Sequence, residues 1–374
     1  MAFFGDRMKS NLAGKVRTDK ERNSALDYPL MAPKANGTAI QITEGILWIR
    51  MPMPMALDHI NLYLLEDDDG WFIIDTGLHT NKTKELWLVV AENHCQIKPI
   101  KGLICTHFHY DHSSLAQWLM DTFNIPLFMT YGEFYTLATH SRALDTLGNS
   151  HQRQFYQHAG VPLDTVEKIF EACKKDPFME HRPSKFNRLR HDDVLTIGKR
   201  RWRIVIGEGH SPEHACLYCE EDKLLLAGDQ LLPHISSNIL VSEIEPMGQP
   251  LKNWLRSLKQ IQSLDANTLV MPAHGPIFTQ MHVRAQQLID HHFDTLSTLQ
   301  DFARHHSQFN AYEAMQHLFN RKLSPIDTLM ALGETLAHLN WLAANDDLQC
   351  QRQVNEGVDM YCSTQSLKLD RKKA

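Results

Sequence analysis

The heptapeptide THFHYDH, residues 106–112, places His107, His109, Asp111 and His112 within six positions of one another. The apolar run GLIC precedes it, and an amphipathic pattern follows it over residues 113–122. This order predicts a buried strand, a loop and a helix, with the polar residues on the loop. An isolated His-x-His pair could be two ordinary hydrogen-bonded histidines. Four imidazole and carboxylate donors on one loop can hardly all point apart, however, so the stretch predicts a metal site.

Three further ligand-type residues stand at the ends of predicted strands. They are His210 in GEGHSPEH, Asp229 in AGD and His274 in PAHG. Each has a glycine beside it or nearby, which lets the backbone approach a site closely. Seven candidate ligands exceed what one tetrahedral ion can use, so the sequence predicts two divalent metal ions. Imidazole and carboxylate donors suit zinc first, with iron or manganese as alternatives.

The composition is that of a globular protein. With 374 residues and 43% hydrophobic content, the chain is long enough for two or three domains at roughly 150 residues each. No stretch approaches the roughly 20 apolar residues of a membrane span, and charged residues lie where a secretory signal would be apolar. We therefore predict a cytoplasmic protein without a membrane partner. The seven scattered cysteines indicate reduced thiols.

Charge is uneven along the chain. The net charge of −6 argues against a protein built to coat nucleic acid. Residues 182–203 nevertheless hold eight basic and two acidic side chains, a local balance of +6. The basic ones are Arg182, Lys185, Arg188, Arg190, Lys199, Arg200, Arg201 and Arg203. This basic segment predicts an anionic substrate contacted by Arg188 and Arg190, although a solvated loop would look the same. No aromatic platform interleaved with basic residues is visible, which makes nucleic acid the less favoured partner without excluding it.

The order of elements predicts a catalytic domain followed by a smaller one. Strand patterns over residues 39–51, 60–74, 100–105, 193–207, 215–220, 223–226 and 268–272 alternate with helical patterns over 82–92, 113–122 and 251–261. From residue 282 the pattern changes to helices at 282–305, 311–319 and 325–345 and a hairpin turning at 355–357, which is typical of a winged-helix-like domain. We predict an irregular segment at 1–38, a catalytic domain at 39–280 with a helical insertion at 131–192, and the C-terminal domain at 281–374.

Five motifs in order, DTG at Asp75, THFHYDH, GHSPEH, AGD and PAHG, resemble the metallo-β-lactamase superfamily, and within it the glyoxalase II and lactamase-beta-2-like hydrolases. The resemblance covers roughly residues 39–280 and implies an α/β fold, an αββα sandwich with the site at one edge. It implies that His107, His109 and His210 hold one metal ion. Asp111, His112 and His274 would hold the other ion, and Asp229 would bridge the two. Asp75 would support the ligands without touching a metal.

The chemistry implied is hydrolysis by a metal-bridging hydroxide. Two metals roughly 3.5–4 Å apart lower the pKa of a bridging water towards about 7 and polarise the scissile bond. Asp111 would also orient this nucleophile, and His214 would either stabilise the leaving group or support a ligand. His59, His234 and Asn238 are candidate substrate contacts, with plain loop positions as the alternative.

The substrate class is less well defined, because the same chemistry serves thioesters, esters, lactones, β-lactams and phosphodiesters. We predict a thioesterase or esterase acting on an anionic small molecule. The alternative is an endoribonuclease or phosphodiesterase with the same metals, and a di-iron redox protein is a third hypothesis that the absence of a flavodoxin-type domain disfavours. The third C-terminal helix carries Asp327 and Glu334 and no lysine or arginine, so we predict that the C-terminal domain provides a packing or homodimer surface.

Overall fold

The computed structural model describes residues 25–55, 57–143, 147–174, 182–353 and 357–364. The predicted irregular segment is therefore described only from residue 25, and most of the predicted turn at 355–357 lies outside these ranges. Contacts divide the chain into two compact units. The first comprises residues 1–142, 177–237 and 257–286, and the second comprises 143–176, 238–256 and 287–374.

The first unit contains two β-sheets. The seven-stranded sheet runs in chain order: β1 (Ala39–Thr43), β2 (Ile46–Pro52), β3 (His59–Glu66), β4 (Trp71–Ile74), β5 (Ile100–Ile104), β6 (Leu127–Thr130) and β7 (Asn187–Leu189). The five-stranded sheet has the order β12 (Leu269–Pro272), β11 (Leu224–Gly228), β10 (His214–Cys219), β9 (Arg200–Gly207) and β8 (Val194–Ile197). Parallel pairing begins at β4 in the first sheet and joins β11 to β12 in the second.

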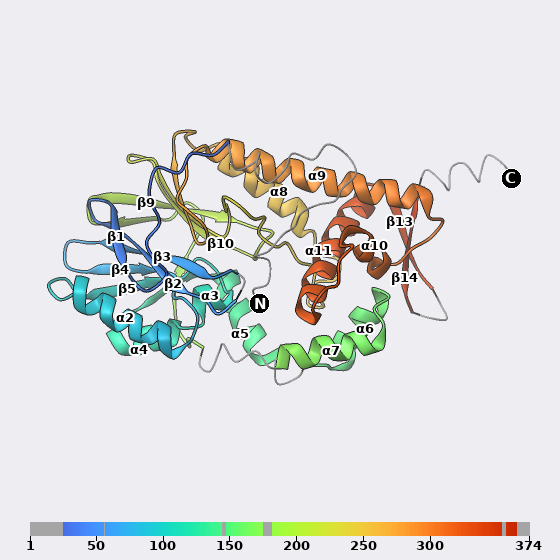
Figure 1. The fold of residues 1–374 in the computed structure, drawn as a ribbon, viewed down its shortest axis with the longest axis horizontal. Coiled ribbons are helices and arrows are strands. Elements are labelled where there is room, and N and C mark those ends of the chain that lie inside the picture. The colour runs from blue at the N-terminus through green and yellow to red at the C-terminus, as the bar shows by residue number, and fades with distance from the viewer. Residues whose placement is uncertain (1–24, 56, 144–146, 175–181, 354–356, 365–374) are drawn as a thin grey trace. The chain divides into compact units, whose positions relative to one another are not determined.

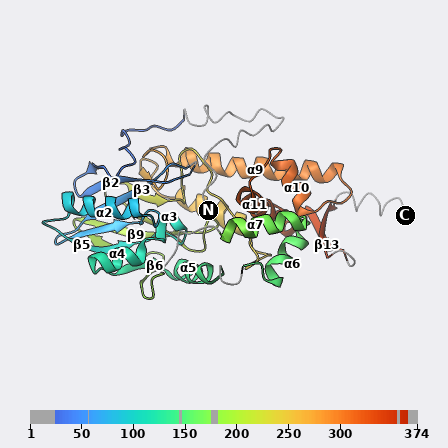
Figure 2. The same ribbon diagram turned by 60° about the horizontal axis from the view of Figure 1, so that its bottom comes forward.

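The two sheets are held together by apolar residues that alternate along the strands. On β3, Tyr63 and Leu65 face one core cluster, shared with Ile204 and Leu217 of the second sheet. Leu62 and Leu64 face the other cluster, which includes side chains of α2 (Asn81–His94) and α4 (Ala116–Phe123). The side-chain period of two thus buries both faces of one strand. Both helices lie on the outer face of the seven-stranded sheet (Figure 1, Figure 2).

The predicted αββα sandwich is confirmed, with local corrections. The expected strand over residues 39–51 is two strands with a turn at Glu44 and Gly45. The helix expected at 113–122 is two, α3 (Tyr110–Ser113) and α4. The segment expected to be helical from residue 131 begins with α5 (Tyr131–Ala143) but ends in β7, an edge strand of three residues. A strand of three residues is too short to show the alternation of apolar and polar residues by which strands are predicted from sequence.

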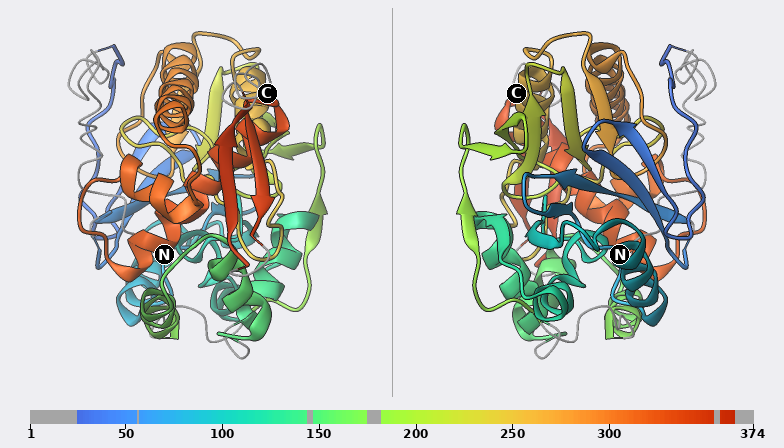
Figure 3. Two further views of the ribbon diagram at one scale, coloured as in Figure 1. Left: turned by 90° about the vertical axis from the view of Figure 1, so that its right-hand side faces the viewer. Right: turned by 90° about the vertical axis from the view of Figure 1, so that its left-hand side faces the viewer.

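The second unit is mainly helical. It contains α6 (Ser150–His158), α7 (Leu163–Lys174), α10 (Ala311–Leu318), α11 (Pro325–Ala344) and most of α9 (Met281–His305), together with the hairpin of β13 (Leu348–Arg352) and β14 (Asp359–Ser363) (Figure 3). Capping boxes begin α10 at Asn310 and α11 at Ser324, where Pro325 occupies the first turn. The three predicted C-terminal helices and the hairpin strands therefore lie where the sequence places them.

The division into units differs from the predicted domain boundaries. Residues 143–176, predicted as part of an insertion in the catalytic domain, group with the C-terminal helices. The reason is the apolar face of α7, where Val166, Ile169 and Phe170 are buried and the helix packs on α11. The predicted boundary at residue 281 coincides with the first residue of α9, whereas the division by contacts falls within this helix, between residues 286 and 287. No helix within the described ranges is long and apolar enough to cross a bilayer.

Candidate metal centre

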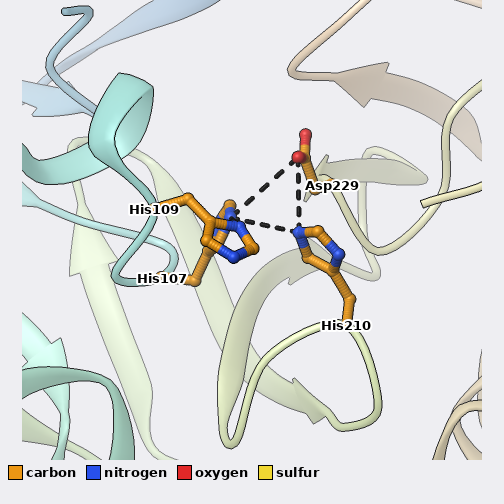
Figure 4. Close-up of side chains that lie close together, drawn as sticks. All are labelled: His107, His109, His210 and Asp229. Carbon is orange, nitrogen blue, oxygen red and sulfur yellow. Dashed lines mark hydrogen bonds and ion pairs between the residues drawn. The ribbon is translucent and has the colours of Figure 1, made fainter. Parts of the chain in front are cut away.

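The seven candidate ligands come together at the ends of strands. One group is His107, His109, His210 and Asp229, and the other is Asp111, His112 and His274. Within each group the potential ligand atoms all lie within 4.8 Å of one another. Figure 4 shows the first group converging from three separate loops, those after β5, β9 and β11.

The first group is compact. His107 Nε2 lies 2.8 Å from His109 Nδ1 and 3.3 Å from His210 Nε2. The Oδ2 atom of Asp229 lies 3.4 Å from His210 Nε2 and 3.9 Å from His107 Nε2. Four donors that a single cation can use therefore face one point.

The second group shares Asp229 with the first. Asp111 Oδ2 lies 3.2 Å from His274 Nε2 and 3.5 Å from His112 Nε2. The other carboxylate oxygen of Asp229, Oδ1, lies 3.4 Å from His274 Nε2 and 3.6 Å from His112 Nε2. Asp229 thus directs one oxygen to each group, the arrangement of a ligand that bridges two cations.

Two buried atoms of this cluster, His112 Nε2 and Asp229 Oδ1, have no hydrogen-bond partner among the described residues. Burying a polar atom without a partner costs about 1–3 kcal/mol. A cation would satisfy both atoms, and a mixed set of imidazoles and carboxylates is one that zinc, iron and manganese accept. The residues present therefore fit two divalent metal ions.

At His107, His109 and Asp111, electrostatics favour the protonation states that metal ligands need. Burial and the neighbouring imidazoles hold the pKa of His107 well below its usual value, and burial with His210 does the same for the pKa of His109. Burial alone would raise the pKa of Asp111, but His112 and His274 hold it at about 2. Burial opposes protonation of His112, yet the surrounding carboxylates raise its pKa well above normal. The carboxylates around His112 therefore favour a positive charge at the second group, and a bound cation would supply that charge in place of the proton.

Asp75 lies behind the ligands. Its Oδ1 accepts a hydrogen bond of 2.7 Å from the Thr106 amide, and its Oδ2 accepts bonds from Thr106 Oγ1 (2.9 Å) and His112 Nδ1 (2.8 Å). Binding at Nδ1 leaves Nε2 of His112 directed at the second group. Asp75 therefore orients a ligand and its loop.

His59, a candidate substrate contact in the sequence, makes two hydrogen bonds to the turn that carries His274. Its carbonyl oxygen accepts a 2.9 Å hydrogen bond from His274 Nδ1, and its Nε2 accepts a 3.0 Å bond from the Gly275 amide. His59 thus stabilises the turn of His274 through both its backbone carbonyl and its imidazole ring.

His214 was expected to act either on the leaving group or as a support. It is fully buried, and its Nε2 accepts a 3.0 Å hydrogen bond from the Asp229 amide. A Cβ atom on Gly228, whose φ is +49°, would lie 2.5 Å from that nitrogen. Of the two roles expected, this geometry favours support, because His214 holds the backbone of Asp229.

The two remaining candidate substrate contacts, His234 and Asn238, lie in different units. His234 is exposed, with its ring 5.5 Å from that of Tyr28, and buried Arg284 holds its loop by donating to Leu232 O (2.6 Å) and Ile235 O (2.9 Å). Asn238 belongs to the second unit, where its Nδ2 lies 3.4 Å from Met330 Sδ. Its side chain therefore contacts α11, and its role as a substrate contact stays a prediction.

The basic segment divides into two parts. Lys199, Arg200 and Arg203 form ion pairs with Glu44, Asp222 and Asp192 respectively. Arg188 and Arg190 are exposed, and neither side chain has an acidic partner among the described residues. The Arg188 guanidinium lies 4.8 Å from the ring centre of Tyr131, an aromatic neighbour that the sequence pattern did not reveal.

Glu133 is a residue of the site that sequence reasoning missed. Its buried carboxylate accepts hydrogen bonds from the Phe108 amide (3.0 Å), Ser211 Oγ (2.7 Å) and the Glu213 amide (2.7 Å). Burial raises its pKa to about 7 against the effect of these donors. The carboxylate thereby joins the loop of His107 and His109 to the loop of His210. An acidic residue in a first helical turn is too common to have signalled this role.

Comparisons with known proteins agree with this fold. The Metallo-beta-lactamase superfamily matches residues 56–274, and a family described as Metallo-beta-lactamase-like, C-terminal domain matches residues 297–364. A beta-lactamase domain protein from Burkholderia ambifaria is 33% identical with a TM-score of 0.84, covering 92% of this chain and 99% of that one. A metallo-beta-lactamase family protein from Thermus thermophilus is 28% identical with a TM-score of 0.70, covering 86% of this chain and 100% of that one.

Curated relatives carry related names. A "Probable metallo-hydrolase YqjP" of Bacillus subtilis is 26% identical over 81% of this chain and 94% of its own length. An "Atrochrysone carboxyl ACP thioesterase" of Aspergillus fumigatus is 23% identical over 64% of this chain and 58% of its own. The matched family spans more than half of the chain and contains every candidate ligand. The chain therefore belongs to the metallo-beta-lactamase superfamily of hydrolases.

Proposed function

We propose that this protein is a binuclear metal-dependent hydrolase that cleaves a thioester or ester of an anionic small molecule. The observation that carries the proposal is the position of Asp229, whose two carboxylate oxygens each face one of the two donor groups. When bound, two divalent cations would lower the pKa of a water molecule and polarise the carbonyl oxygen of the substrate. Zinc suits these donors, with iron and manganese as alternatives.

The roles of the chain's own residues follow from their contacts. His107, His109 and His210 would hold one cation, and Asp111, His112 and His274 the other. Asp111, with its low pKa, stays ionised at neutral pH, so it can accept a hydrogen bond from the attacking water and hold it in line. Glu133, Asp75, His59 and His214 fix the ligand loops before substrate binds.

The choice of a thioester or ester rests on two supports. One is the name of the fungal relative, which describes a thioesterase. The other is the exposed pair Arg188 and Arg190, which would attract an anionic group on the substrate. The same cations favour the second candidate, a phosphodiesterase or endoribonuclease, because phosphates would meet them equally well.

The test is a hydrolysis panel with metal-loaded protein. Acyl thioesters, aryl esters, lactones, a phosphodiester and single-stranded RNA are compared at equal protein concentration, with Asp229→Ala as the control for contaminating activity. We expect the largest kcat/KM on a thioester or ester. Hydrolysis of RNA or the phosphodiester alone, abolished by Asp229→Ala, would replace the proposal with its alternative.

A further inference from the structure

An exposed face of the first unit combines aromatic and basic side chains. It is formed by the first turns of α5 and by the neighbourhood of the edge strand β7, and we name it the α5–β7 face. Its members are Tyr131, Tyr135, Lys185, Phe186, Arg188 and Arg190.

Strand periodicity explains how β7 contributes to this face. Leu189 points inward and is buried in the core between the sheets. Arg188 and Arg190, one residue to either side of it, are exposed, while Phe186 is half-buried and packs against the other core cluster. Phe186 stacks on Phe134 of α5 with ring centres 4.0 Å apart, which fixes the strand edge against the helix.

The aromatic part of the face is open to solvent. Tyr131 is 48% exposed and Tyr135 is 50% exposed, and their ring centres lie 4.5 Å apart. The Arg188 guanidinium stands 4.8 Å from the centre of the Tyr131 ring. Two half-exposed tyrosines beside a guanidinium are a surface on which a flat, electron-rich ring can stack.

The basic part of the face is not neutralised. Lys185, Arg188 and Arg190 are exposed, and the described residues provide no acidic partner for their side chains. The carboxylate of Asp193 accepts a hydrogen bond of 2.8 Å from the backbone amide of Arg190. This differs from Lys199, Arg200 and Arg203 of the same sequence segment, which all have ion-pair partners. The positive charge here is therefore available to an anionic ligand.

The first turn of α5 also joins this face to the metal centre. The Gly132 amide donates a 2.7 Å hydrogen bond to Glu213 Oε2, and Thr130 Oγ1 donates a 2.8 Å bond to Glu213 O. Glu133, next along, holds the loops of both His109 and His210. Tyr131 thus directly precedes the two residues, Gly132 and Glu133, that bond to the loops of the metal ligands.

We propose that the α5–β7 face binds the nucleotide of a coenzyme A thioester, a proposal that rests on the thioesterase function proposed above. The adenine stacks against Tyr131 and Tyr135, and Lys185, Arg188 and Arg190 bind the phosphates. The pantetheine arm then carries the thioester towards the metal centre. The small size of the face favours this ligand over RNA, since two tyrosines and three cations match one nucleotide with its phosphates and form no continuous track for a strand.

Binding of adenosine 3′,5′-bisphosphate to the full chain tests the proposal by calorimetry, without hydrolysis. Tyr131→Leu, which keeps apolar bulk but removes the aromatic face, is expected to weaken binding roughly 5- to 150-fold, the range for loss of one stacked base. Arg188→Glu with Arg190→Glu is expected to weaken it by at least about tenfold through lost charge-assisted contacts. Arg201→Glu is the matched control, because Arg201 is an exposed arginine of the same segment on β9, away from this face. It should leave the dissociation constant within about twofold.

Several results would overturn the proposal. They are no binding by the unaltered chain, an equal loss with Arg201→Glu, or tighter binding of a single-stranded oligonucleotide with a salt slope of several units, about −0.7 per phosphate. Circular dichroism of each variant shows whether the fold is retained. A chain that hydrolyses small thioesters but ignores the bisphosphate refutes only this inference. A chain that binds the bisphosphate but hydrolyses no thioester or ester refutes only the proposed function.

Discussion

Replacement of Glu133 by glutamine tests whether one buried carboxylate holds the two ligand loops together. The carboxylate accepts three hydrogen bonds, one at Oε2 and two at Oε1. A glutamine amide can keep the pair from Ser211 and Glu213 with its oxygen, but its NH₂ group then faces the Phe108 amide. Two donors cannot bond to each other, so the Phe108 N–H loses its acceptor beside the buried side chain of residue 133.

A buried donor without an acceptor costs about 1–3 kcal/mol, which is the expected fall in the free energy of unfolding of the metal-free protein. The loss falls on the loop that carries His107 and His109. Because residues that orient metal ligands typically change metal affinity by about 10- to 100-fold, we expect a loss in this range at the first donor group. Glu133→Asp, which keeps the charge on a shorter side chain, should lie between the unaltered chain and Glu133→Gln.

The assay pairs urea unfolding of the metal-free protein with zinc titration against a chromophoric chelator. Glu92→Gln is the matched control, since Glu92 is an exposed glutamate of α2 in the same unit and has no role at the site. The reasoning is refuted if Glu133→Gln matches Glu92→Gln in both measurements. A fall in stability with metal affinity unchanged would reduce Glu133 to a purely structural residue.

Three further changes have defined outcomes. Asp229→Ala should lose more bound metal and more activity than His274→Ala, because a bridging carboxylate contacts both groups, whereas water can replace one imidazole. Equal losses in metal content and in kcat/KM would count against a bridging role for Asp229. Gly228→Ala places a Cβ 2.5 Å from His214 Nε2 at a positive φ, so we expect its thermal midpoint to fall by several degrees, and an unchanged midpoint would contradict the packing described. Burial raises the pKa of Glu334 to about 7 from 4.5, so its proton is bound more tightly in the folded state. The free energy of unfolding should therefore fall by about 3 kcal/mol as pH rises from about 4.5 to above 7, and Glu334→Gln should flatten this fall in urea titrations.

The metal ligands that could be predicted from the sequence are those that lie close together along the chain. The crowding of His107, His109, Asp111 and His112 on one loop is visible without a structure, because a seven-residue stretch can hardly disperse its donors. His210 and the two later ligands follow strand-like runs, and their order along the chain carried the family resemblance. The sandwich was expected because that resemblance implies it, while the strand-like runs gave only the approximate positions of the strands.

What could not be predicted depends on contacts between distant segments. Glu133 acquires its role from donors at Phe108, Ser211 and Glu213, none of which is its sequence neighbour. Tyr131 and Arg188 meet only because β6 pairs with β7, a strand too short to be detected. The grouping of α7 with the C-terminal helices has the same cause, because the apolar residues of α7 do not reveal which helix will cover them.

Retention of metal by the unaltered chain tests the central claim most directly. Elemental analysis after zinc loading and removal of free metal should give about two ions per chain. His107→Ala, analysed in parallel, should keep its circular dichroism spectrum and lose metal from the first group together with turnover. At most one ion per chain in the unaltered protein, with hydrolytic activity intact, would contradict the binuclear centre.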